Sequence, residues 1–267
     1  MISDDIIDSC NRNWATGIGW LAEIAKGGRI VKFPEGNFIV RTGLPDQDFN
    51  LAFVFRPPNL SAEVTRSIQH LFIDTKTNFE VVVSPEARDS IVPALHGLNL
   101  EFLRKVPGML LDTLPDSVPA RPNGLEIHQV EDTDELFAFA HVMNAGFGAT
   151  PDSFDLVLEG LKEKWEEYKS NAKGSVFYVG YFEGKPIATS VRFTSDSIAG
   201  IYAVSTLKEF RRRGFGEAMV WKAAIDGKLE GCTKSYLQAS EMGRPIYEKM
   251  GYHVICEYDV WGIKKEN

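Results

Sequence analysis

Apolar residues in the first half of the chain fall into two alternating patterns. Short runs of apolar and β-branched residues predict strands at 29–33, 37–41, 49–55, 79–83 and 109–112. Between them, apolar residues three or four positions apart predict helices over 60–72 and 87–98. This alternation of strands and helices is typical of a sheet covered by helices.

The same alternation continues, more regularly, after residue 124. The pattern predicts strands at 125–130, 175–182, 185–194, 197–204, 234–239 and 252–261. It predicts helices at 133–144, 153–169, 214–229 and 244–250. The pair Glu183-Gly184 separates two of the strands and indicates a hairpin turn. Both halves are therefore expected to be α/β in class.

A proline-rich segment separates the two halves. Pro115, Pro119 and Pro122 lie close together between 115 and 124, and proline continues neither a helix nor a central strand. We therefore expect an N-terminal domain at 1–114, a linker at 115–124 and a C-terminal domain at 125–267. A chain of 267 residues is long enough for two cores of about 130 residues each.

Charge and composition exclude several classes of protein. Lys and Arg number 29 against 37 Asp and Glu, so the formal charge is −8 and a basic face for nucleic acid is not expected. No run approaches the ~20 apolar residues of a membrane span, and the acidic N-terminus is unlike a secretory signal. We expect a cytoplasmic protein that binds neither nucleic acid nor membrane.

The three cysteines, Cys10, Cys232 and Cys256, lie too far apart in the sequence for a disulfide or metal framework and are expected to be reduced.

Residues 203–216 carry the pattern most suggestive of chemistry. They join a predicted strand to a predicted helix and place Arg211, Arg212 and Arg213 just before Gly214 and Gly216. The free amides and the dipole of a helix N-terminus attract anions, and glycine lets an anion approach the backbone closely. The segment lacks the Gly-Lys-Ser/Thr ending of a P-loop and the spacing of a dinucleotide turn. The alternative is a solvated basic turn that caps a surface helix.

Two motifs in the second half resemble those of one enzyme family. Arg211, Gly214 and Gly216 fill the Arg/Gln-x-x-Gly-x-Gly/Ala pattern with which GNAT N-acetyltransferases bind acetyl-CoA. The segment 236–252 resembles the second motif of that family, in which a strand leads to a short helix with a tyrosine, here Tyr247. The resemblance covers 125–261. It implies a mixed α/β sheet and acetyl-CoA as cosubstrate, with no metal.

The first half resembles the N-terminal region of bacterial tandem GNAT proteins. The residues that carry this likeness are 41–45 with Phe49-Asn50, and 106–109. No Arg-x-x-Gly-x-Gly pattern precedes the linker, so this half is expected to bind no acetyl-CoA of its own. The resemblance therefore implies two tandem GNAT-like acyl-CoA N-acyltransferase domains, of which the first is degenerate and the second intact.

The resemblance also implies the residues of the site. The expected cofactor-binding positions are Ala203, Val204, Thr206, Arg211, Arg212, Arg213, Gly214, Phe215, Gly216, Ser240, Arg244 and Tyr247. A backbone amide near Ala203–Val204 would polarise the thioester carbonyl, and Tyr247 would act as the general acid for the leaving thiolate. The alternatives are that Tyr247 is a packed helix tyrosine bonded to backbone and that Ser240 is a simple helix cap.

The sequence gives less information about the acceptor site and the general base. The loop 146–151 is where the family shapes its acceptor site, and its glycines would allow a mobile lip. Phe147 and Tyr202 are the expected acceptor-side residues, although Tyr202 equally fits a residue that fills the sheet. The candidate bases are His141, Glu159, Asp196 and Tyr202, and bulk water is a further proton acceptor.

Together these patterns predict an acetyl-CoA-dependent N-acetyltransferase that passes the acetyl group directly to an amine of a small molecule or peptide. Cofactor binding and turnover are separate properties, so a non-catalytic acyl-CoA sensor is the alternative from another class. A binding site for CoA gives little information about the length of the acyl chain, so transfer of a longer acyl group is a further alternative.

Overall fold

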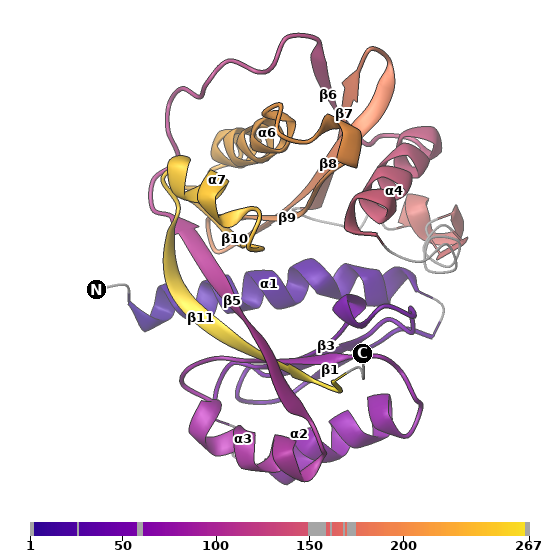
Figure 1. Ribbon diagram of the computed structural model, residues 1–267, viewed down its shortest axis with the longest axis vertical. Coiled ribbons are helices and arrows are strands. Elements are labelled where there is room, and N and C mark those ends of the chain that lie inside the picture. Colours follow the sequence, from indigo (N-terminus) through magenta and orange to yellow (C-terminus); the bar gives the residue numbers. More distant parts are fainter. Residues whose placement is uncertain are drawn as a thin grey trace. The chain divides into compact units, whose positions relative to one another are not determined.

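The structure is a computed structural model that describes residues 3–25, 27–57, 61–148, 159–160, 162–167, 169 and 175–264. Its packing divides the chain into two compact units (Figure 1). The first unit joins 1–17 to 109–253, and the second joins 18–108 to 254–267. The chain therefore crosses between the units at points other than the linker, and the domain limits expected from the sequence stay a prediction.

The first unit contains a mixed sheet. Its strands follow the order β6-β7-β8-β9-β10, and the end of β5 (Glu101–Leu111) lies beside β10. Neighbours from β6 to β9 are antiparallel, whereas β9 and β10 are parallel. The bounds are β6 (Leu125–Gln129), β7 (Ser175–Phe182), β8 (Lys185–Ser195), β9 (Ile198–Thr206) and β10 (Lys234–Gln238).

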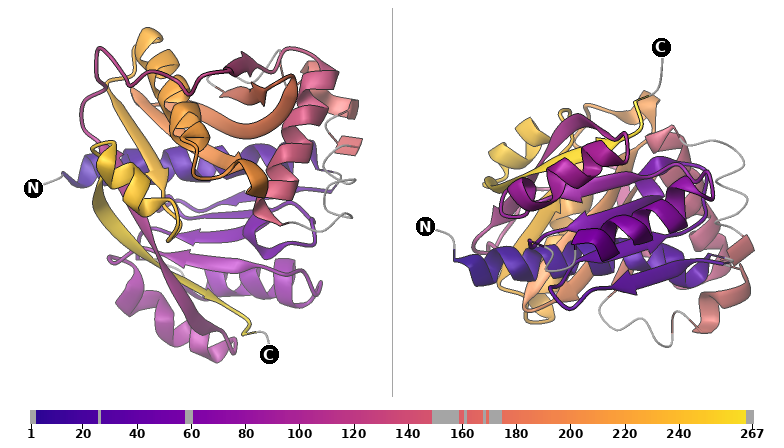
Figure 2. Two further views of the ribbon diagram at one scale, coloured as in Figure 1. Left: turned by 45° about the horizontal axis from the view of Figure 1, so that its top comes forward. Right: turned by 90° about the horizontal axis from the view of Figure 1, so that it is seen from below.

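Helices cover both faces of this sheet (Figure 2). On one face, Ser190 of β8 donates to the Met219 carbonyl of α6 (Phe215–Leu229). On the other, Ser205 of β9 donates to a carbonyl of α4 (Thr133–Phe147). The first half of α1 (Asp4–Ile24) shares this second face, because Asn13 bonds to Ser195. Side chains alternate between the faces along a strand, so each strand residue can be assigned to the α6 face or to the α1/α4 face.

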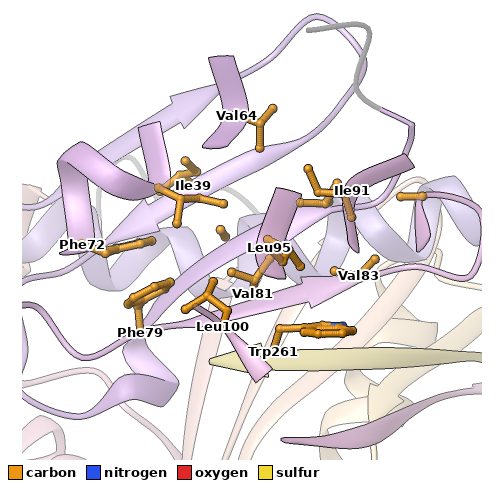
Figure 3. Packing of buried hydrophobic residues seen from close by; sticks show 14 of the residues in the cluster. Ile39, Val64, Phe72, Phe79, Val81, Val83, Ile91, Leu95, Leu100 and Trp261 are labelled. Atoms are coloured by element: carbon orange, nitrogen blue, oxygen red, sulfur yellow. The ribbon is translucent and has the colours of Figure 1, made fainter. Parts of the chain in front are cut away.

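The second unit contains the remaining strands of the sheet and a core of its own. The strand order is β1-β2-β3-β4-β11-β5, and α2 (Ser61–Ile68), the π turn Gln69–Ile73 and α3 (Arg88–Gly97) pack against it. In the core, Phe72 stacks on Phe79 with ring centroids 4.7 Å apart (Figure 3). The remaining bounds are β1 (Arg29–Lys32), β2 (Phe38–Arg41), β3 (Asn50–Val54), β4 (Glu80–Val83) and β11 (His253–Gly262).

Asn50, one of the residues in which the first half resembles tandem GNAT proteins, stabilises the loop after β2. It is fully buried, and its side-chain oxygen accepts hydrogen bonds from the amides of Thr42 and Gly43, both at 3.0 Å. Its side-chain nitrogen donates to the carbonyls of Leu44, at 2.8 Å, and Asp46, at 3.2 Å. One side chain therefore supplies the partners that a buried loop backbone requires, and the motif has a structural role in the loop after β2.

The predicted mixed α/β fold is confirmed, with two differences in its elements. The sequence analysis predicted no helix before residue 29, yet α1 occupies Asp4–Ile24. The strand predicted at 109–112 is the end of a longer one, β5. Most of the helix predicted at 153–169 lies outside the described residues.

Candidate active site

Strands β9 and β10 pair only at their beginnings. The parallel ladder runs from Ile198 with Lys234 to Gly200 with Tyr236 and then ends. Strand β9 continues to Thr206, so its last part has no strand partner on the β10 side. Unpaired backbone at a strand edge can bind an extended ligand, which makes this opening the centre of the candidate site.

A bulge distorts β9 in the part of the strand that is not paired with β10. Thr189 of β8 pairs with Ser205 and Val191 pairs with Tyr202, so Ala203 and Val204 together oppose one residue. Ala203 has φ = +49°, which is costly for a residue with a Cβ. Bulges and strained residues recur at functional sites, where they re-aim backbone groups. This bulge falls where the sequence analysis expected an amide to face the thioester.

The turn between β9 and α6 presents unpaired amides. The Arg211 amide donates to the Lys208 carbonyl and the Ala218 amide to the Gly214 carbonyl. Between them, the amides of 212–217 have no acceptor among the described residues. Arg212 and Gly214 adopt positive φ values of +63° and +80°, which turn the chain into the helix. Unpaired amides at the positive end of a helix are an arrangement that can bind an anion.

The three arginines of the turn have different roles. Arg211 donates to the carbonyls of Thr206, at 2.9 Å, and Gly146, at 2.8 Å, so it ties the turn to β9 and α4. The Arg213 guanidinium lies 4.5 Å from the Phe182 ring centroid and 4.9 Å from that of Phe215. Arg212 is exposed and has no partner among the described residues. Of the arginine charges expected at the anion site, that of Arg212 is the most available.

Tyr247 lies on α7 (Arg244–Lys249), with its ring centroid 6.0 Å from that of Tyr252. Burial raises the pKa of Tyr247 to about 12, so its hydroxyl is protonated at neutral pH. That hydroxyl has no hydrogen-bond partner among the described residues, whereas the Tyr252 hydroxyl donates to Ser235 at 2.7 Å. The Tyr247 hydroxyl is therefore available as a proton donor, whereas the Tyr252 hydroxyl has a structural role.

Ser240 and Arg244 make local contacts around α7. The Ser240 hydroxyl oxygen accepts from the Gly243 amide at 3.1 Å in the turn before α7, but the N-cap residue of the helix is Gly243, so Ser240 is not the helix cap. Arg244 pairs with Glu248 at 2.8 Å on the exposed side of the helix. Among the other expected positions, Thr206 accepts the bond from Arg211, and Phe215 is buried at the start of α6.

The two expected acceptor-side residues lie in different environments. Tyr202 is 8% exposed and donates its hydroxyl proton to the Asn13 side chain, a location that favours the sheet-filling interpretation. Phe147 is 59% exposed at the end of α4. Residues 149–151 of the expected lip lie outside the described residues.

The candidate bases and the cysteines occupy separate positions. Asp196 pairs with Arg12 at 2.9 Å in the turn between β8 and β9. His141 and Glu159 are exposed. Cys10, Cys232 and Cys256 are buried free thiols, and burial raises the pKa of Cys256 to about 11. A thiol with a raised pKa is a poor nucleophile at neutral pH.

The buried tyrosines make stability sensitive to alkali. Desolvation raises the pKa of Tyr247 to about 12 and also raises those of Tyr178, Tyr202 and Tyr252. An unfolded tyrosine titrates near 10, so above that pH the unfolded chain has lost protons that the folded chain keeps. We expect the free energy of unfolding to decline as pH rises from 10 to 12. Urea titrations at pH 9, 10 and 11 measure this, and equal midpoints would contradict it.

Comparison with known proteins agrees with this geometry. Residues 173–254 match the family model described as the acetyltransferase (GNAT) domain. That segment contains the β9 bulge, the unpaired amides of 212–217 and Tyr247. A search of curated proteins gave no match.

Solved structures with the same fold cover most of the chain. A GCN5-related N-acetyltransferase from Kribbella flavida has a TM-score of 0.64 at 18% identity, over 97% of this chain and 96% of its own. One from Sphaerobacter thermophilus gives 0.61 at 16%, over 89% and 81%. A tandem GNAT protein from the clavulanic acid biosynthesis pathway gives 0.57 at 11%, over 86% and 79%. At these identities the likeness shows the fold, which is that of GNAT proteins of similar length. No helix in the described part of the chain is long and apolar enough to cross a membrane.

Proposed function

We propose that this chain, an acyltransferase with a GNAT acetyltransferase domain at 173–254, transfers the acetyl group of acetyl-CoA directly to an amine of a small molecule or peptide. The observation that carries the proposal is the row of unpaired amides at 212–217, placed directly after the bulged end of β9. A pyrophosphate needs such donors at a helix N-terminus, and a thioester needs an activating amide near the reacting carbonyl.

The residues present fit acetyl-CoA. The amides of 212–217 would hold the pyrophosphate and Arg212 would add a charge that does not titrate. Gly214 and Gly216 leave this backbone uncovered, since a Cβ at Gly216 would meet only the Thr206 hydroxyl, at 3.4 Å. The unpaired edge of β9 would run along the pantetheine arm. Acetyl-CoA supplies an already activated thioester, so the protein has mainly to position the two reactants.

The chain's own groups account for the charges of the transfer. The Ala203–Val204 backbone would stabilise the negative charge that develops on the carbonyl oxygen as the amine nitrogen forms the C–N bond. The C–S bond breaks, and the leaving thiolate would take a proton from the Tyr247 hydroxyl. Water would accept the proton released by the amine and later restore that of Tyr247. Ser240 and Arg244 would border the cofactor from α7, and Phe147 the acceptor from α4.

Two measurements on the full chain test the proposal. Titration calorimetry with acetyl-CoA detects binding, and release of CoA thiol during an amine screen detects turnover. Binding without turnover for any amine would favour an acyl-CoA sensor. Faster release from longer acyl-CoAs would show that the acyl specificity is wrong. No binding of any acyl-CoA would overturn the proposal.

Arg212→Glu should raise the Kd for acetyl-CoA about tenfold, because it puts a negative charge beside the proposed pyrophosphate position. Arg66→Glu is the matched control: it makes the same charge change on the exposed surface of α2 in the second unit. Calorimetry at low salt should show a large change for the first variant and almost none for the second. Equal dissociation constants would contradict the assignment of Arg212.

A further inference from the structure

Gln238 is a polar residue at the opening between β9 and β10 that the proposed chemistry has not used. It is the last residue of β10 and lies beyond Tyr236, where the ladder with β9 ends. Its side-chain nitrogen is buried and has no hydrogen-bond partner among the described residues. A buried donor without an acceptor is unfavourable and, in a site that binds a ligand, suggests that the ligand supplies the acceptor.

The pairing of the strands gives the face on which Gln238 lies. Gln238 and Tyr236 are two residues apart and share a face of the sheet, and Tyr236 pairs with Gly200. A Cβ on Gly200 would clash with Asn13 of α1, so this is the α1/α4 face. Gln238 therefore approaches the opening from the side that carries α1 and α4.

The proposed cofactor groups lie on the opposite face. Ala199 faces α6, because its Cβ lies 2.7 Å from where a side chain on Gly227 would begin. Ser235 pairs with Ala199 and receives the hydrogen bond of Tyr252, which contacts Tyr247. Tyr247 and the N-terminus of α6 therefore belong to the α6 face. An amine that approaches from the side not occupied by the leaving thiolate would come from the α1/α4 face, past Gln238.

We infer that Gln238 selects the acceptor by donating a hydrogen bond to an oxygen close to its amine, so that the preferred acceptors are amines with an adjacent carbonyl or carboxylate, such as amino acids and peptide N-termini. This inference rests on the proposed acetyl transfer and adds a substrate class to it. An amide donor suits such an oxygen, and a site with a buried donor discriminates against an analogue that leaves it unpaired.

Matched pairs of amines test the inference. Phenylalaninamide and phenylalanine are compared with phenethylamine, which has the same phenylethyl amine but lacks the carboxamide or carboxylate group, and CoA thiol release gives kcat/KM for each. The wild-type protein should favour one of the oxygen-bearing amines at least tenfold over phenethylamine. Gln238→Leu should lower that ratio at least fivefold, with the Kd for acetyl-CoA unchanged. Gln238→Glu should penalise phenylalanine more than phenylalaninamide, because two carboxylates then face each other.

The control experiments distinguish failure of this inference from failure of the proposed acetyl transfer. Gln69→Leu changes a surface glutamine of the second unit that bonds to Asp74 and should keep the wild-type ratio. Thermal melting checks that each variant is folded, and Gln238→Glu gives a second test should Gln238→Leu unfold.

A wild-type protein that acetylates phenethylamine as fast as the others, or a ratio that is unchanged in Gln238→Leu, overturns the inference alone. A Kd for acetyl-CoA that rises tenfold in Gln238→Leu also overturns it, because the side chain would then contact the cofactor. Absence of acetyl-CoA binding, or of turnover with every amine, overturns the inference together with the transfer itself.

Discussion

Tyr247→Phe should lower kcat at least 100-fold and leave the Kd for acetyl-CoA within about twofold of the wild-type value. The substitution removes only a hydroxyl, and that hydroxyl is the proposed proton donor to the leaving thiolate; general acid catalysis typically contributes 10²–10⁴-fold. Since the hydroxyl has no partner among the described residues, its removal breaks no hydrogen bond there. Steady-state kinetics and calorimetry on the same preparation measure the two quantities.

Tyr252→Phe is the matched control for this experiment. Its hydroxyl donates to Ser235 and lies near Tyr247, so its removal should lower stability and affect kcat far less. The pH profile adds a second check, because a pKa near 12 for Tyr247 means that its own ionisation does not lower the rate of the wild-type enzyme below about pH 11. Unchanged turnover in Tyr247→Phe would remove this residue from the mechanism.

Asn13→Ala should reduce the free energy of unfolding by about 3 kcal/mol, as expected when several buried groups lose their partners. Asn13 is 1% exposed. Its side-chain nitrogen donates to the Phe193 carbonyl and the Ser195 hydroxyl, and its oxygen accepts from Tyr202. All these groups belong to the first unit. Urea denaturation followed by circular dichroism measures the change.

Arg12→Gln gives the comparison at the neighbouring position. Arg12 pairs with Asp196 at 2.9 Å, with both side chains about half exposed, and exposed ion pairs contribute less than about 1 kcal/mol. Its unfolding midpoint should lie close to that of the wild type. Equal losses in the two variants would indicate that the surface ion pair contributes as much as the buried amide, which would contradict the prediction.

The strands of the first unit could be predicted well because their side chains alternate and their turns have clear signals. The strand predicted at 175–182 matches β7 residue for residue, and Glu183-Gly184 forms a turn with positive φ at both residues. The helix α1 was missed although its sequence shows acidic residues in the first turn and apolar residues at Ile6, Cys10 and Trp14. Gly17 and Gly19 in its second half lower the helix propensity, so local preference alone does not predict this element.

The candidate site could be located from sequence but its internal contacts could not. A sequence motif gives the positions of arginines and glycines along the chain, so the turn at 211–216 was expected. That Arg211 bonds to two carbonyls and Arg213 packs on aromatic rings depends on residues far away in the sequence, such as Gly146 and Phe182. The role inferred for Gln238 depends on where the ladder of β9 and β10 ends, and no local pattern predicts that point.

The position of β11 has a consequence for how the protein is made. This strand follows residues 109–253 of the first unit in sequence, yet in the second unit it lies between β4 and β5 and pairs Val260 with Val82 and Trp261 with Val81. Until residues 253–262 have been synthesised, the strands of the second unit made before them leave a valine-rich edge of β4 without its partner. Such edges invite pairing with other chains, so premature termination just before β11 should yield insoluble polypeptide.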